Sequence, residues 1–116
     1  MIRTADKLLF EEKTDHMDGN GHLVIRHMLI SPDEMLQKGR VFAHSTLEPG
    51  ASIGYHMHEG ESEIYYIYSG RGEINDNGEI KPIKAGDTII TQNGQGHSIK
   101  NTSDEALHFI ALILYE

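Results

Sequence analysis

Short runs of alternating apolar and polar residues, separated by turn residues, make up most of this chain. Alternation places successive side chains on opposite faces of a strand, whereas an amphipathic helix repeats near 3.6 residues. The runs predict strands at residues 22–30, 41–47, 52–58, 63–69, 71–75, 79–84, 88–91, 97–101 and 106–115. About eight or nine short strands at such close spacing favour an all-β sandwich or barrel.

The turn and cap residues add one short helix and one hairpin. Ser31 and Pro32 have the side chains of an N-cap and a first helical position, so we expect a helix of two turns or less at about 32–38. Asn77-Gly78 predicts a tight hairpin between two strands, and Pro82 makes the second of them an edge or bulged strand. The polar segment before residue 22 has Leu8, Leu9 and Phe10 as its apolar cluster and reads as a loop over 14–21.

Length and charge narrow the classes of protein. The 116 residues suit one domain, residues 1–116. Eighteen acidic against ten basic residues give a net charge of −8, which disfavours nucleic acids and anionic membranes as partners. No apolar run approaches the ~20 residues of a membrane span, and the first residues lack a signal-peptide apolar region. The absence of cysteine excludes disulfides and thiolate metal sites and is compatible with the cytoplasm, where we expect the protein.

The candidate chemistry lies in the spacing of the histidines. His56 and His58 share one face of a predicted strand, and Met57 points to the other. Buried imidazoles need hydrogen-bond or charge partners, and a metal ion satisfies both rings at once. Glu63, after a stretch long enough to turn the chain, and His97, at the start of a later strand, complete a set of three imidazoles and one carboxylate. This set suits a first-row divalent metal and leaves a charge of about +1, which attracts an anionic ligand.

The same residues stand in a wider frame of glycines. The order Gly50, His56, His58, Glu63, Gly70 resembles the first motif of the cupin superfamily throughout. Gly86, Gly94, His97 and Asn101 match the second motif, and the one departure is Gln92, where that family usually has proline. The two motifs span nearly half of the chain. The run from His58 to Ile67 looks like small single-domain cupins of the oxalate-decarboxylase-like type.

The resemblance implies a cupin jelly-roll barrel, or double-stranded β-helix, with one metal ion near its centre. His56, His58, Glu63 and His97 would be the ligands, and the metal would be Mn, Fe, Ni, Co or Zn. The matched glycines would serve turns, and Asn101 would be structural. Residues 1–30 would form an arm and a first strand in contact with a partner, residues 40–115 the barrel, and the protein would be a homodimer.

Three functions remain open on this basis. The first is a small metalloenzyme, an oxidoreductase or lyase of the dioxygenase or decarboxylase type, acting on an oxygen-rich anionic small molecule. The alternatives are a non-catalytic cupin that binds or senses a small molecule or sugar, and a metal-dependent isomerase. The catalytic residues stay unknown. The candidates are Glu59 as a general base in the loop, Tyr65 facing the barrel interior and His44, which could line the pocket but fits better at its rim.

The remaining histidines, arginines and tyrosines are assigned to positions outside the pocket. His108 could face the pocket or the solvent, and solvent is favoured. His16, His22 and His27 are treated as surface residues. Nothing in the sequence places Arg26, Arg40 or Arg71 in the pocket. Tyr66 and Tyr68 face outward from their strand and indicate a covered surface, which fits sheet-on-sheet packing in a dimer.

Overall fold

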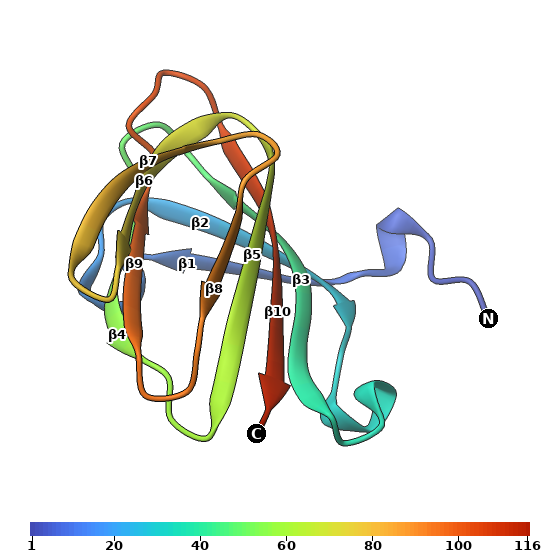
Figure 1. Cartoon of the computed structure of the whole chain (residues 1–116). Coiled ribbons are helices and arrows are strands. Elements are labelled where there is room, and N and C mark those ends of the chain that lie inside the picture. Colours follow the sequence, from blue (N-terminus) through green and yellow to red (C-terminus); the bar gives the residue numbers. More distant parts are fainter.

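Two antiparallel β-sheets lie face to face in the computed structural model, which describes residues 1–116 (Figure 1). The six-stranded sheet has the order β1 (Leu9–Thr14), β2 (His22–Leu29), β3 (Gly39–Leu47), β10 (Leu107–Tyr115), β5 (Glu61–Ser69), β8 (Thr88–Thr91). The four-stranded sheet has the order β4 (Ser52–Met57), β9 (Gly96–Lys100), β6 (Arg71–Asp76), β7 (Glu79–Lys84). The chain crosses repeatedly between the sheets, which is the jelly-roll arrangement. The all-β prediction is therefore confirmed.

Every strand predicted from alternation is present, with its ends within two residues of the expected positions. The strand that the sequence did not reveal is β1. Its residues facing the interior are the charged Glu11 and Lys13, so the apolar alternation that marks the other strands is missing. β1 pairs with β2 along its whole length and gives the six-stranded sheet an outer strand.

The predicted helix is shorter than expected. Pro32–Met35 forms one turn of 3-10 helix (η3), and Leu36 and Gln37 end it in the left-handed region with φ of 55° and 59°. Two further 3-10 turns, η1 (Ala5–Lys7) and η2 (His16–Asp18), flank β1. None of these turns has the length and apolar character that crossing a bilayer requires.

The hairpin and edge-strand predictions are confirmed. Asn77 and Gly78 connect β6 to β7 with φ of 50° and 100°, the positive values that a primed two-residue turn needs. Pro82 lies in β7, the outer strand of the four-stranded sheet, where a missing N–H breaks no ladder.

Alternation along β5 and β10 divides core from surface. Tyr65 and Ile67 are 3% and 0% exposed, whereas Tyr66 and Tyr68 are 45% and 41% exposed. The largest apolar side chains buried between the sheets are Leu23, Leu47, Ile67, Ile99, Leu107 and Phe109. Leu47, Ile67, Ile99 and Leu107 fill one part of the barrel, and the small inward residues Ala43, Ser45 and Ala111 of β3 and β10 leave the other part hollow.

The segment before β2 is fixed to β4 by close backbone contacts. Asn20 and Ser52 exchange two backbone hydrogen bonds of 3.2 and 2.7 Å. Gly54 allows the approach, because a Cβ at that position would lie 1.9 Å from the backbone oxygen of Met17. The η2 turn is thereby held against the strand that carries His56.

Asn101 ties three backbone segments together from a fully buried position. Its amide nitrogen donates to the carbonyl oxygens of Leu47 (3.0 Å) and Glu105 (2.7 Å), and its oxygen accepts from the Ser103 N–H (2.9 Å). Its contacts are to the backbone and to the Ser103 hydroxyl, away from the cavity. The assignment of Asn101 to a structural role agrees with these bonds.

We expect Asn101→Ala to lower the free energy of unfolding by roughly 1–3 kcal/mol, because buried backbone groups lose their partners. Urea unfolding followed by circular dichroism measures the change, with the exposed neighbour Thr102→Ala as control. Equal unfolding midpoints for Asn101→Ala and the wild type would show that these bonds carry no net stability.

Candidate metal centre

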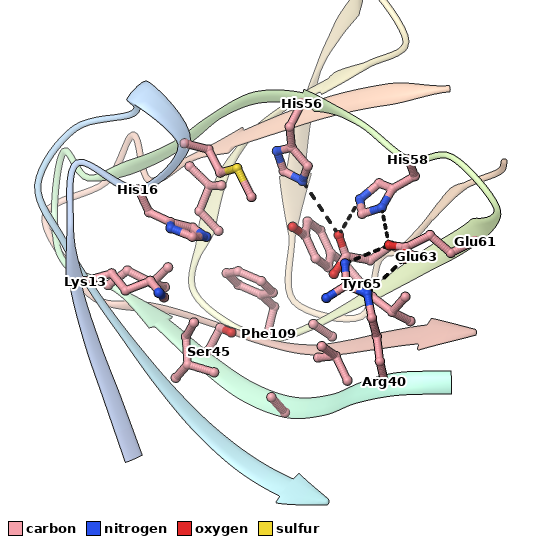
Figure 2. Close-up of a pocket in the computed structure, with 18 of the residues that line it drawn as sticks. Lys13, His16, Arg40, Ser45, His56, His58, Glu61, Glu63, Tyr65 and Phe109 are labelled. Atoms are coloured by element: carbon pink, nitrogen blue, oxygen red, sulfur yellow. Dashed lines mark hydrogen bonds and ion pairs between the residues drawn. The ribbon is translucent and has the colours of Figure 1, made fainter. Parts of the chain in front are cut away.

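Four side chains from both sheets converge at one end of the cavity (Figure 2). β4 and β9 place His56 opposite His97 in register, the turn after β4 supplies His58, and β5 supplies Glu63. The four candidate ligand atoms, three Nε2 and one carboxylate oxygen, all lie within 4.8 Å of one another. The structure thus brings together all four residues expected to hold the metal.

The distances describe a set of atoms around a common centre. Glu63 Oε1 lies 3.0 Å from the Nε2 atoms of His58 and His97 and 4.0 Å from that of His56. His97 Nε2 lies 3.0 Å from His56 Nε2 and 3.2 Å from His58 Nε2. These spacings are compatible with atoms that share a coordination sphere with bonds near 2 Å.

The outer nitrogen of each ring has a partner of its own. His56 Nδ1 lies 2.8 Å from the Gly54 carbonyl oxygen, which accepts only, so this nitrogen carries the proton. His97 Nδ1 lies 2.7 Å from the Thr91 hydroxyl, which can accept the ring N–H. Such bonds on Nδ1 direct the Nε2 lone pairs to the centre, as in histidines that ligate metals.

His58 is oriented by a charged pair. Its Nδ1 lies 2.8 Å from Glu61 Oε2, and the Arg40 guanidinium holds both Glu61 oxygens through two bonds of 2.8 Å. The hydrogen bonds from Arg40 keep the pKa of the Glu61 carboxyl below its ordinary value. Glu61 therefore stays ionised and accepts the His58 proton, while its own charge is balanced by Arg40.

The centre consists of acceptors with no fixed donor among them. With Nδ1 protonated, the three imidazoles present lone pairs to one another and to the Glu63 carboxylate across a few ångströms. A cation at the centre removes this repulsion, and the nitrogen and oxygen donors are those that first-row divalent metals prefer. The residues therefore fit a metal ion, which is what the donor set alone predicted.

Burial and the neighbouring rings act in opposite directions on Glu63. Burial favours the neutral acid, but the three neighbouring imidazoles outweigh it and hold the pKa of this carboxyl far below its ordinary value. The pKa of His58 is raised, chiefly by Glu63, whereas burial lowers the pKa of His97. Glu63 thus favours a proton on His58, and a bound metal ion would displace such a proton.

A cavity of about 760 Å³ opens beside these ligands. Its floor consists of inward residues of β2, β3 and β10, and one wall comes from β1 and η2. Apolar side chains of the lining include Leu23, Ile25, Val41, Ala43, Phe109 and Ala111.

Two of the three catalytic candidates, Tyr65 and Glu59, line this cavity. Tyr65 is buried with its ring stacked on His97, at 4.9 Å between centroids and 17° between planes. Burial raises the pKa of the Tyr65 hydroxyl, which stays protonated at neutral pH. Glu59 is exposed at the rim of the cavity.

His44 does not line the cavity, in agreement with the preference for a position outside the pocket. Ala43 and Ser45 face the cavity, and alternation along β3 therefore turns His44 to the outer face of the six-stranded sheet. There its Nε2 lies 3.1 Å from His108 Nδ1 and 2.5 Å from the Tyr68 hydroxyl. His108 faces outward, as the sequence favoured.

The assignment of His16 and His27 to the surface is wrong. Both line the cavity, and His27 Nε2 lies 2.6 Å from Glu11 Oε1. Lys13 and Arg40 line it as well. Recognising β1 as a strand would have revealed these cavity residues. Its alternation places the charged Glu11 and Lys13 on the inward face, which indicates a polar cavity between the sheets.

Comparisons with known proteins agree on one family. Residues 43–113 match the model of the cupin domain family. The "Oxalate-binding protein" of Thermotoga maritima is 43% identical over 114 residues, 98% of this chain and 93% of that protein. A crystal structure described as a predicted oxalate decarboxylase, also from Thermotoga maritima, has a TM-score of 0.94 and 42% identity over 100% of both chains.

A more distant structure shows how widely the fold is used. A sugar phosphate isomerase from a cupin superfamily of Silicibacter pomeroyi has a TM-score of 0.78 at 19% identity. The match covers 100% of this chain and 76% of the isomerase, and at this identity it shows the shared fold alone.

We expect His58→Ala to abolish stoichiometric metal uptake, because it removes a ligand from the centre of the set. Elemental analysis after dialysis against Mn²⁺, Fe²⁺, Co²⁺, Ni²⁺ or Zn²⁺ measures the metal content per chain. The matched control is His108→Ala, which removes an imidazole on the outer face and should leave the content at one ion. Equal metal content in wild type and His58→Ala would contradict the assignment.

Proposed function

The chain belongs to the cupin family, and from that premise we propose that it binds one divalent transition-metal ion and acts there on a small, oxygen-rich anion. The ligands would be His56, His58, Glu63 and His97. The observation that carries the proposal is the convergence of these four acceptor atoms at the end of an open cavity. A bound ion would act as a Lewis acid toward an oxygen ligand.

Charge supports an anionic ligand. The divalent ion and one carboxylate leave about +1 at the centre, since Glu61 is already neutralised by Arg40. Lys13 on the cavity wall is paired with Glu11 at 3.5 Å, so the positive charge lies at the metal, within a chain whose net charge is −8. A local positive site inside an acidic protein favours small anions and repels acidic macromolecules.

Oxalate is the first probe to use. The relative from Thermotoga maritima at 43% identity is named for oxalate binding, and the similar crystal structure is described as a predicted oxalate decarboxylase. Decarboxylation of hydrogen oxalate breaks its carbon–carbon bond, gives carbon dioxide and requires a proton on the remaining carbon to give formate. The Tyr65 hydroxyl and the Glu59 carboxyl at the cavity are the candidates for handling that proton.

Non-catalytic binding is the second candidate, because the name of that relative states binding and no reaction. An isomerase of phosphorylated sugars is less well supported. Lys84 and Lys100, which could hold a phosphate, line separate surface hollows away from the cluster.

Titration of the metal-loaded protein with oxalate, followed by assays for formate, carbon dioxide and oxygen uptake, tests these functions. We expect oxalate binding that requires the metal and is lost in His58→Ala. Formate without oxygen uptake indicates a decarboxylase, oxygen uptake indicates an oxidase or dioxygenase, and binding without turnover indicates a binding protein. Failure of the metal-loaded protein to bind oxalate or any other small carboxylate would contradict the proposal.

We also propose that the protein is a homodimer formed through the outer face of the six-stranded sheet. On β3, β5, β8 and β10 the residues that point inward are buried. Residues on the opposite face of the same strands form an apolar surface: Phe42, Ile64, Tyr66, Ile90, Ile110 and Leu112. Phe42, Leu112, Ile64 and Ile90 are neighbours in register across four strands. A continuous apolar surface of this kind is typical of a protein interface.

Sedimentation at micromolar concentration should give the mass of a dimer for the wild type. Leu112→Glu should give a monomer, because it places a charge in the middle of that surface. Ile80→Glu is the control, since Ile80 is 62% exposed on β7 of the other sheet and should leave the dimer intact. A monomeric wild type would contradict the proposed assembly.

A further inference from the structure

The cavity is much larger than oxalate. Its volume of about 760 Å³ equals the share of roughly 25 water molecules in the liquid, whereas oxalate has six heavy atoms. A two-carbon ligand at the metal cluster would leave most of the space to water, much of it against apolar walls. The size of the cavity therefore indicates a longer ligand.

Small side chains create this space at the centre of the floor. Ala43 and Ala111 face each other in register on β3 and β10, and Ser45 lies opposite Phe109 on the same pair of strands. Larger residues at these inward positions would fill the barrel, as Leu47 and Leu107 do at its closed end. The hollow thus extends from the metal cluster along the sheet to Ser45.

Ser45 is a buried polar group without a partner. Its residue is 5% exposed, and its hydroxyl makes no hydrogen bond to any other group of the chain. Every completely enclosed polar side-chain atom of the protein has a hydrogen-bond partner. The Ser45 hydroxyl has none, so it is not completely enclosed and opens on the cavity. Buried hydroxyls are normally hydrogen-bonded, and one that is free inside a cavity is available to a ligand.

Two further donors share that end of the cavity. Figure 2 shows Lys13, His16 and Ser45 grouped on the side away from His56, His58 and Glu63, with Phe109 between the two groups. The Lys13 ammonium is 3.5 Å from Glu11, and that carboxylate is already bonded to His27. The hydrogen bond from His27 lowers the pKa of Glu11 below its ordinary value, so Glu11 is ionised and pairs with Lys13. The Lys13 ammonium has three N–H donors and can bind a ligand carboxylate beside Glu11.

The turn that carries His16 is held in place. Asp15, Met17 and Asp18 all have left-handed backbones, with φ of 53°, 56° and 61°. Side chains disfavour this region, so the segment keeps its shape because its contacts with β4 impose it. The η2 turn therefore holds the His16 side chain in a fixed position at the cavity.

The two ends are too far apart for oxalate to contact both. Glu63 lies opposite Ile113 on β10, and Ser45 lies opposite Phe109, four residues along and two strands across from Glu63. That offset is roughly 13 Å along the strands and about 10 Å across them. A ligand that reaches both groups needs several carbons between its polar ends.

From these observations we infer a second anchor site at Ser45, with Lys13 and His16, which binds the far carboxylate of a ligand whose other end chelates the metal. The ligand class is a 2-oxo dicarboxylate with an apolar spacer of several carbons, lying over Ala43, Ala111 and Phe109. This inference rests on the proposed metal site, and it makes oxalate a fragment of the natural ligand.

Competition against oxalate on the metal-loaded protein tests the inference with two probes that differ only at the far end. 2-Oxosebacate has the chelating head, a seven-carbon spacer long enough for this offset and a second carboxylate, and 2-oxodecanoate has the same chain length without that carboxylate. We expect 2-oxosebacate to bind at least about 10-fold more tightly, because its far carboxylate accepts charge-assisted hydrogen bonds.

Ser45→Ala and Lys13→Met should each reduce that ratio by about 3- to 10-fold. Thr46→Ala, the next residue on β3 and directed to the outer face, is the matched control and should keep the wild-type ratio. Equal affinities for the two acids in a wild type that binds oxalate would overturn the inference and leave the proposed function standing. Loss of binding for oxalate and both acids would overturn the two together.

Discussion

Repulsion among four acceptor atoms is the constraint on which this structure depends. Three imidazole lone pairs and one carboxylate meet inside a β-barrel, and their outer nitrogens are engaged elsewhere. Such a cluster is costly without a positive charge at its centre. A metal ion would supply that charge.

The fold distributes the ligands so that neither sheet holds the site alone. The four-stranded sheet contributes His56 and His97, the turn after its strand β4 contributes His58, and the six-stranded sheet contributes Glu63. Glu61 and Arg40 then fix His58 from β5 and β3, which belong to the sheet of Glu63. A metal bound there cross-links the two sheets and should stabilise the folded state by mass action.

Much of this arrangement could be predicted from the sequence, because both signals are periodic or fixed in spacing. Alternation revealed the strands, and the positions of His56, His58, Glu63 and His97 revealed the cluster. Other features depend on contacts between segments distant in the chain. Arg40 and Glu61 are 21 residues apart, and nothing local pairs them. β1 was not predicted because its inward side chains are charged. Without β1 no cavity wall was expected there, and His16 and His27 were therefore assigned to the surface. Ser45 reads as an ordinary strand serine until the cavity beside it is known.

The most direct test of the account is X-ray absorption at the edge of the bound metal in the metal-loaded protein. Three histidines and one carboxylate predict a first shell of nitrogen and oxygen at about 2.0–2.2 Å, with the outer-shell scattering of three imidazole rings. A shell of oxygen atoms with no imidazole scattering would mean that the metal binds elsewhere, and the proposed chemistry of this cavity would have no basis.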